Sequence, residues 1–201
     1  MPAIEANRPQ SAGVSSRSGI PGPALPPAAL FSGDGAWCVV GAKRLLLRPL
    51  MAEDADDLGR LIDAATDEDR LLPCARGQVG SWIDEAERHR RSGEAHTFLL
   101  IRRKDPVVLG AANLRRDEDH AGHWQIGYWV AAPYRRQRYC TEAVEALVRF
   151  AFDELAAAAL DASVPVFNTP SIRLLKRLRF RAVPGVGDAP DVGLWQRARR
   201  G

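Results

Sequence analysis

The segment at residues 133–143, PYRRQRYCTEA, holds the side chains best suited to binding chemistry. It lies between an apolar segment, IGYWVAA, and a helix-like segment, TEAVEALVRFAFDEL. A strand, a tight turn and a helix N-terminus suit a phosphate, because backbone N–H groups there have no intrahelical acceptor. Such turns usually contain glycine, whereas this one contains Arg135, Arg136 and Arg138. Arginine can instead offer a charge-assisted, bidentate bond to phosphate. The alternative is a solvated surface patch.

Two further residues near this segment have reactive side chains. His123 has an ordinary pKa near 6.5, so it could act as a base directly or through water. The alternative is an exposed residue at the end of a loop. Cys140 falls at the predicted helix N-terminus, which could lower the pKa of its thiol and favour a nucleophile. We favour a small packing role for Cys140.

The elements that must position these residues can be assigned from apolar spacing. We expect a strand at 44–50, helices at about 52–65 (with Asp54 as a cap) and 78–91, and an antiparallel meander of three strands over about 97–131, with a bulge at Gly110. Apolar residues at helical spacing define the long helix after the turn: Val144, Leu147, Val148, Ala151, Phe152 and Leu155. A strand at 162–167, a helix capped by Asn168 or Thr169 and two final strands complete the order β-α-α-β-β-β-α-β-α-β-β.

The strand at 124–131, the long helix and the strand at 162–167 are expected to form a right-handed β-α-β unit with parallel strands. Ligands of open α/β sheets bind outside the carboxyl ends of such strands. The arginine-rich turn follows one of these ends, so the topology also predicts a ligand site there.

Composition limits the classes of function. The formal net charge is +3, from 28 basic and 25 acidic side chains among 201 residues, which does not favour a nucleic-acid partner. No apolar run reaches the roughly 18 residues of a membrane span, and we see no signal peptide. Three cysteines without metal-ligand spacing favour reduced thiols in the cytoplasm and no metal site. Residues 1–42, rich in Pro, Gly, Ser and Ala, are expected to form a flexible tail before one domain at 43–201.

Three segments carry a resemblance to a known family: RLLLRPL, WQIGYWVAAPYRRQRYCTEAVEALVRFAFDEL and NTPSIRLLKRLRF. In order and spacing, over about residues 43–198, the chain resembles the GCN5-related N-acetyltransferase (GNAT) superfamily. Within it, the chain is most similar to the ribosomal-protein N-terminal acetyltransferase (RimJ/RimL-like) branch. The resemblance implies an α/β (α+β) fold with a mixed sheet of about six to seven strands and helices on both faces. It also implies acetyl-CoA as donor and an amine as acceptor, and it leaves a monomer and a homodimer open.

The resemblance also implies roles for individual residues. The pantetheine of the cofactor would lie between the two parallel strands, and a backbone N–H of Trp129 or Val130 would bind the thioester oxygen. Asn168 and Ser171 would contact the pantetheine arm, with Ser171 donating a proton towards the sulfur; the alternative for both is helix capping. Gln125 stands where the branch often has a glutamate, and His123 shares its side of the strand. The pyrophosphate turn would comprise Arg135, Arg136, Gln137, Arg138, Tyr139, Cys140 and Thr141.

The chain departs from the family pattern where glycine is usual, at Arg136, Arg138 and Arg179. An arginine forced to positive φ would cost about 1–2 kcal/mol, whereas in a helical conformation its side chain would point away at little cost. We expect cofactor binding to be retained, but weaker or with a different balance of contacts. Two functions stay open: an active N-acetyltransferase for a protein N-terminus or small amine, and a catalytically impaired pseudoenzyme that serves as a binding or regulatory module.

Overall fold

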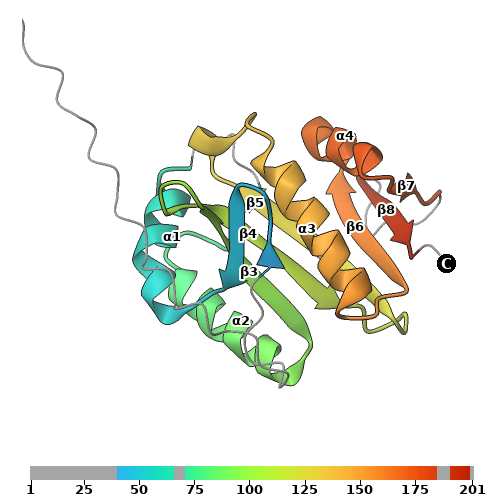
Figure 1. The fold of residues 1–201 in the computed structure, drawn as a ribbon, viewed down its shortest axis with the longest axis horizontal. Coiled ribbons are helices and arrows are strands. Elements are labelled where there is room, and N and C mark those ends of the chain that lie inside the picture. The colour runs from blue at the N-terminus through green and yellow to red at the C-terminus, as the bar shows by residue number, and fades with distance from the viewer. Residues whose placement is uncertain (1–39, 66–70, 185–190, 200–201) are drawn as a thin grey trace, which may run out of the picture.

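A computed structural model describes residues 40–65, 71–184 and 191–199. Its centre is an eight-stranded sheet in the order β1-β2-β3-β4-β5-β6-β8-β7 (Figure 1). The strands are β1 (Val40–Gly41), β2 (Leu45–Pro49), β3 (Ala95–Arg102), β4 (Val107–Arg116), β5 (His123–Val130), β6 (Ala159–Pro165), β7 (Arg181–Ala182) and β8 (Val192–Ala198). The α-helices are α1 (Ala55–Asp63), α2 (Val79–Ser92), α3 (Tyr139–Asp153) and α4 (Thr169–Arg177).

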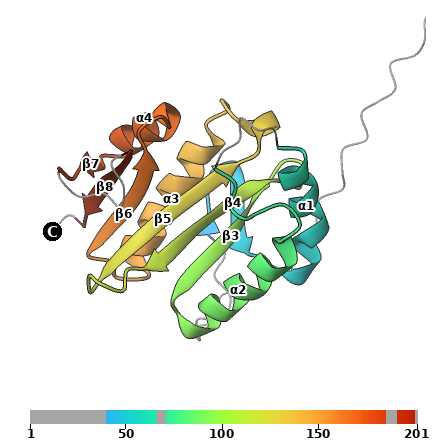
Figure 2. The same cartoon turned by 180° about the vertical axis from the view of Figure 1, so that it is seen from behind.

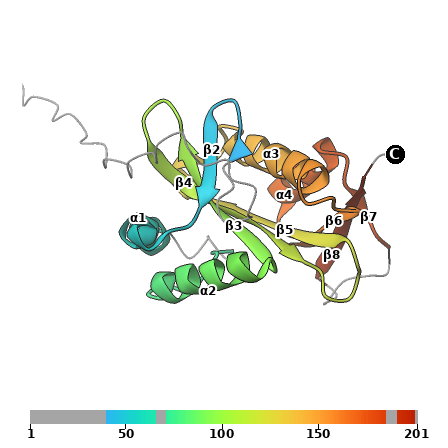
Figure 3. The same ribbon diagram turned by 60° about the horizontal axis from the view of Figure 1, so that its bottom comes forward.

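Helices cover both faces of the sheet, as the resemblance implied. Figure 3 shows α1 and α2 on one face and α3 and α4 on the other. The central strands are buried between two apolar clusters, because successive side chains of a strand point to opposite faces. On β3, Phe98 and Leu100 belong to the cluster that contains residues of α3. Leu99 and Ile101 belong to the cluster that contains residues of α1 and α2.

The three-stranded meander and its bulge are confirmed. Strands β3, β4 and β5 pair antiparallel in sequence order. The β3–β4 register shifts where Leu100 pairs with Gly110 and Ile101 pairs with Val108, so one residue of β4 is extra. A Cβ on Gly110 would lie 2.1 Å from the backbone oxygen of Trp129, so only glycine fits there. The bulge therefore fixes how β4 meets the end of β5.

The parallel unit is also confirmed, and it contains the opening that matters for the site. Strands β5 and β6 pair only over three residues, from His123 with Ala159 to Gln125 with Asp161. Beyond this point the two strands separate, and α3 connects them along the chain (Figure 2). On the predicted apolar face of α3, Val144, Leu147, Val148 and Ala151 are buried. Phe152 and Leu155, near its end, are partly buried and pack against the same apolar cluster, so the predicted periodicity is correct.

Some boundaries differ from the sequence prediction. Strand β6 spans Ala159–Pro165 instead of 162–167, because pairing with β5 and β8 recruits alanine-rich residues with little strand preference. Val166 and Phe167 are exposed in the turn before α4. Val40 and Gly41, assigned to the tail, pair with β2 as an additional strand, so the sheet has eight strands instead of six to seven. The rest of the predicted tail, residues 1–39, lies outside the described residues.

Candidate active site

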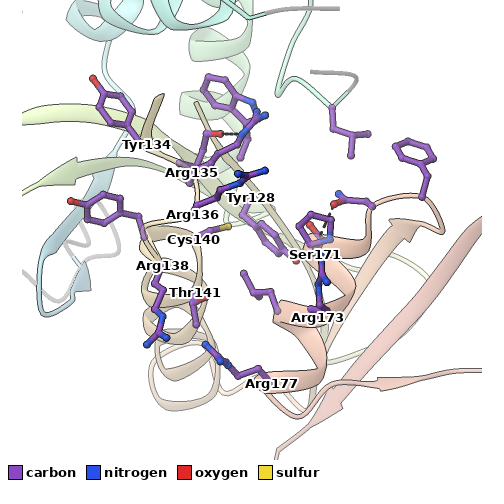
Figure 4. A pocket seen from close by; sticks show the side chains of 18 residues that line it. Tyr128, Tyr134, Arg135, Arg136, Arg138, Cys140, Thr141, Ser171, Arg173 and Arg177 are labelled. Carbon is purple, nitrogen blue, oxygen red and sulfur yellow. Dashed lines mark hydrogen bonds between the residues drawn. The ribbon is translucent and has the colours of Figure 1, made fainter. Parts of the chain in front are cut away.

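The separation of β5 from β6 coincides with a cavity of about 720 Å³. Its wall is formed by the end of β5, the turn that follows, the first turn of α3 and part of α4 (Figure 4). The structure thus brings together two segments that are distant in the sequence. Gln137 is in the same turn but does not line the cavity. The predicted site residues on this wall are Trp129, Val130, Arg135, Arg136, Arg138, Tyr139, Cys140, Thr141, Asn168 and Ser171.

The turn before α3 has a left-handed backbone at two arginines. Arg138 is the N-cap residue of α3, with φ of 65°, and Arg136 has φ of 60°. The alternative of a helical Arg138 with little cost is therefore wrong. Each left-handed arginine costs about 1–2 kcal/mol relative to a right-handed conformation. Both arginines thus have the left-handed conformation that glycine adopts without strain.

Contacts with Arg44 and with the end of β5 hold this strained turn in place. Arg44 donates through Nε to Glu142 Oε2 at 2.8 Å and through Nη2 to the Gln137 carbonyl oxygen at 3.0 Å. Arg135 donates through Nε to the Val130 carbonyl oxygen at 2.8 Å. Arg44 also lies over the ring of Tyr139, 4.5 Å from its centroid. Tyr139 is itself buried and forms part of the cavity wall, so its role here is packing.

The charged residues on the described wall of this cavity are all arginines. Arg135, Arg136 and Arg138 come from the predicted turn, and Arg173 and Arg177 come from α4. Sequence reasoning missed the last two, although their i, i+4 spacing places both on one face of the helix. In Figure 4, Arg138 and Arg177 extend from α3 and α4 towards the same end of the cavity. Without a carboxylate among them, these guanidinium groups form an anion-binding surface.

A second cavity of about 290 Å³ lies next to the first. The two cavities share lining residues and so meet where β5 and β6 separate; the shared residues are Leu71, Tyr128, Trp129, Asn168 and Ser171. The described lining of the second cavity carries no charged side chain, and its polar residues include Thr97, Asn113 and Ser163. A charged reactant in one cavity and an uncharged reactant in the other would meet at this junction.

Asn168 and Ser171 lie at that junction and also cap α4. Asn168 is the N-cap residue, and its Oδ1 accepts a hydrogen bond from the Ser171 backbone N–H at 3.3 Å. Capping leaves the Ser171 hydroxyl available, and Ser171 lines both cavities. Asn168 and Ser171 can therefore cap α4 and contact a ligand at the same time.

His123 and Gln125 are at the opposite end of β5 from the junction. At about 3.3 Å per residue, His123 lies roughly 20 Å along the strand from Trp129. His123 Nδ1 is 2.7 Å from Asp161 Oδ2, and Gln125 Nε2 donates to Asp117 Oδ2 at 3.2 Å. Neither residue lines either cavity. The structure thus gives His123 a role in joining β5 to β6 and does not bring it to the site.

The Cys140 thiol is protonated at neutral pH. Burial raises its pKa to about 12, although the neighbouring charge of Arg135 acts in the opposite direction. A helix N-terminus could lower this pKa, but loss of hydration is the larger effect here. A neutral thiol is a poor nucleophile, so the geometry agrees with a small packing residue at this position.

The direction of the β5 backbone identifies its free polar groups. The Ala131 N–H donates to the Leu109 carbonyl oxygen at 2.9 Å, towards β4. The backbone N–H groups of successive residues in a strand point to opposite sides of that strand. The Val130 N–H therefore faces the side where β6 has separated. Of the two residues implied for binding the thioester oxygen, Val130 therefore has the suitable orientation.

Two polar side-chain groups at the junction were not predicted to act: Tyr128 was not a candidate, and Trp129 was expected to act only through its backbone N–H. Tyr128 Oη and Trp129 Nε1 are both buried, and neither has a hydrogen-bond partner among the described residues. Buried polar groups are rarely unpartnered, so two in succession are unusual. The sequence offers little signal for them, because GYW also fits an ordinary buried strand.

Comparison with known proteins identifies the family. Residues 44–181 match the family described as the acetyltransferase (GNAT) domain. The chain belongs to the GNAT acetyltransferase family. It is thereby an acyltransferase, and the resemblance to this family seen in its sequence is confirmed. An uncharacterized N-acetyltransferase of Bacillus licheniformis, p20, is 28% identical over 142 residues, which cover 69% of this chain and 80% of p20.

Solved GNAT structures have the same fold. Mycobacterium smegmatis RimJ, in complex with CoA-disulfide, has a TM-score of 0.69 and 23% identity, with 82% of this chain and 88% of that chain covered. RimL, a ribosomal L7/L12 alpha-N-protein acetyltransferase in complex with coenzyme A, has a TM-score of 0.70 and 16% identity, with 80% and 97% covered. At these identities, the likeness concerns the fold.

Neither a membrane-spanning helix nor a metal-binding cluster is found among the described residues. No helix there is both long and apolar enough to cross a membrane. No group of three or more His, Cys, Asp or Glu side chains in the same ranges has an arrangement that could hold a metal ion.

Proposed function

We propose that this chain transfers the acetyl group of acetyl-CoA to a primary amine. The observation that carries the proposal is the separation of β5 from β6 beside a cavity whose described charged residues are all arginines. Acetyl-CoA combines a phosphate-bearing nucleotide with a thioester on a narrow arm. These parts correspond to the arginine-lined cavity and to the gap between the strands.

The phosphate end is supported by both backbone and side chains. The first N–H groups of α3, at Tyr139, Cys140 and Thr141, have no acceptor within the helix and can bind a pyrophosphate. Arg136 and Arg138 belong to the turn before α3, line the cavity and have no ion-pair partner within the described ranges. They can therefore contribute charge that a glycine-containing turn would lack, although the backbone is strained as a result.

The reacting end is supported by groups that face the junction. Bound acetyl-CoA supplies an activated acyl group whose carbonyl oxygen gains negative charge during transfer. The Val130 N–H is oriented to donate to that oxygen, and the Ser171 hydroxyl borders the junction where the departing sulfur would lie. The Asn168 side chain holds Ser171 in place by accepting a hydrogen bond from the Ser171 backbone N–H.

The second cavity is proposed to bind the acceptor. A reactive amine must be neutral, and no carboxylate or histidine lines the described part of this cavity to remove its proton. An α-amino group, with a pKa near 8, is substantially neutral at physiological pH, whereas a lysine side chain, near 10.4, is not. The uncharged cavity therefore favours a protein N-terminus or a small amine of similar basicity.

Calorimetric titration of acetyl-CoA tests the proposal. We expect micromolar binding by the wild type. Arg138→Gly relieves a left-handed arginine, so its free energy of unfolding should rise by about 1 kcal/mol. It also removes a charge, so acetyl-CoA should bind about tenfold more weakly.

Arg179→Gly is the matched control. Arg179 has φ of 67°, close to that of Arg138, but it lies after α4 and does not line the cavity. The same gain in stability is expected, with unchanged binding. Absence of binding by the wild type, restored by Arg138→Gly, would contradict the active-enzyme proposal and support the catalytically impaired alternative.

A further inference from the structure

The buried hydroxyl of Tyr128 lacks a partner at the point where the two cavities meet. Its Oη has no hydrogen-bond partner among the described residues, and Tyr128 lines both cavities. Figure 4 shows the side chain between α3 and α4, extending towards Ser171. A buried donor without an acceptor reduces stability, so its retention calls for a compensating role.

The neighbours of this hydroxyl define what it can bind. Cys140 from α3 and Ser171 from α4 are the side chains that influence it, and no carboxylate does so. Burial raises the pKa of Tyr128 far above its usual value. Ser171 lies near enough to act in the opposite direction, but the two side chains do not reach hydrogen-bond geometry. The hydroxyl thus keeps its proton throughout the physiological range and is available as a donor to a ligand atom.

We propose that Tyr128 is a catalytic residue whose hydroxyl donates a hydrogen bond to the sulfur of acetyl-CoA. This inference rests on the proposed function. In the transfer, the acceptor nitrogen bonds to the acetyl carbon, the C–S bond breaks, and its electron pair passes to sulfur. The ammonium proton leaves to water, and the thiolate later takes a proton from water, either directly or through the Ser171 hydroxyl, which regains its own proton from water. Tyr128 keeps its own proton and stabilises the negative sulfur.

The position of Tyr128 agrees with this role. The Val130 N–H, two residues further along β5, faces the gap between β5 and β6, and Ser171 borders the same junction. One short stretch of strand would therefore supply a donor for the carbonyl oxygen and a donor for the sulfur. The two donors act on different atoms of the thioester, so both contribute as charge develops.

The first test uses the protein without ligand. Tyr128→Phe removes an unpartnered hydroxyl, so we expect the melting temperature to rise by about 2–4 °C. Tyr134→Phe is the matched control, because Tyr134 lines the same cavity while its hydroxyl points away from it in Figure 4. This control should change neither the melting temperature nor the pKa of the bound CoA thiol. A lower melting temperature for Tyr128→Phe would show that the hydroxyl has a structural partner and would overturn the proposal.

The second test measures the pKa of the bound CoA thiol from its thiolate absorbance, as a difference between loaded and free protein. A donor to sulfur stabilises the thiolate, so Tyr128→Phe should raise this pKa by about one pH unit, a tenfold change in the equilibrium. The kcat should fall about tenfold or more, with little change in the KM for acetyl-CoA. Equal thiol pKa values in wild type and Tyr128→Phe would overturn the role of Tyr128 alone. Failure of the wild type to bind CoA would overturn the proposed function as well.

Discussion

Two oppositely charged residues, Arg48 and Asp54, are fully buried and bind each other. Arg48 donates through Nη1 to Asp54 Oδ2 at 2.7 Å and through Nη2 to Oδ1 at 2.6 Å. Asp54 Oδ2 also accepts the Met51 backbone N–H at 2.9 Å. The pair therefore ties the end of β2 to the start of α1. Asp54 was expected only as a helix cap, and its main partner is in fact a buried arginine.

We predict that Asp54→Asn lowers the free energy of unfolding by about 3–5 kcal/mol, because it leaves a buried guanidinium without a negative partner. Asp105→Asn is the matched control, since Arg102 also binds Asp105 through two nitrogens but Asp105 is exposed. An exposed pair contributes about 1 kcal/mol or less. Denaturant unfolding of both variants measures the difference. Similar losses would contradict the importance of burial.

His96 produces a pH dependence whose sign follows from its surroundings. Burial lowers its pKa below 6.5, and the charges of Arg90 and Arg116 lower it further. The unfolded chain then binds more protons than the folded chain just below pH 6.5, so the free energy of unfolding should rise with pH through that window. His96→Phe keeps an aromatic ring near Phe98 and Trp124 and removes the titration. Unfolding from about pH 5 to 8 should show a flatter profile for this variant, and parallel profiles would contradict the prediction.

Among the secondary-structure elements, the site depends on where strands join and where they separate. Asp161 accepts from Gln196 Nε2 at 2.9 Å and lies 2.7 Å from His123 Nδ1, so it joins β5, β6 and β8 at the paired end. The Gly110 bulge fixes β4 against Trp129 at the open end. The gap that we propose for the pantetheine is therefore defined by contacts at both of its ends.

Gly110→Ala should destabilise the fold by about 2 kcal/mol or more and weaken acetyl-CoA binding, because the new Cβ would displace the backbone of Trp129. Gly59→Ala is the control, since a Cβ in α1 at that position meets nothing within 4 Å. It should stabilise the protein by about 0.5–1 kcal/mol through helix propensity and leave binding unchanged. Thermal unfolding and calorimetry together test the pair, and a tolerated Gly110→Ala would contradict the steric argument.

Over the whole molecule, the distribution of charge matters more than its sum. The net charge of +3 is small, yet five arginines from two distant segments line one cavity. Strand β6 runs parallel to β5, so the turn before α3 and the start of α4 both follow the carboxyl ends of these strands. The arginines of the two segments therefore meet at the same end of the sheet. This convergence is the basis for expecting electrostatic binding.

Acetyl-CoA binding should weaken by about tenfold between about 0.01 M and 1 M salt, because the Debye length falls from about 30 Å to about 3 Å. Acetyl-pantetheine, which lacks the nucleotide phosphates, is the control ligand and should bind more weakly but with little dependence on salt. Arg177→Gln should reduce the salt dependence for acetyl-CoA. An affinity that is independent of salt would contradict an arginine-based phosphate site.

The family, the element order, the crossover unit and the arginine-rich turn could all be predicted from the amino-acid sequence. These features depend on local spacing, such as the apolar face of α3, and on motifs that are continuous in the chain. Other features depend on contacts between distant segments and emerged only in three dimensions: Arg138 has a left-handed backbone, Arg173 and Arg177 reach the cavity, and His123 lies away from it. The unpartnered hydroxyl of Tyr128 belongs with them, because burial and hydrogen-bond satisfaction depend on what packs around a residue and not on its neighbours in sequence.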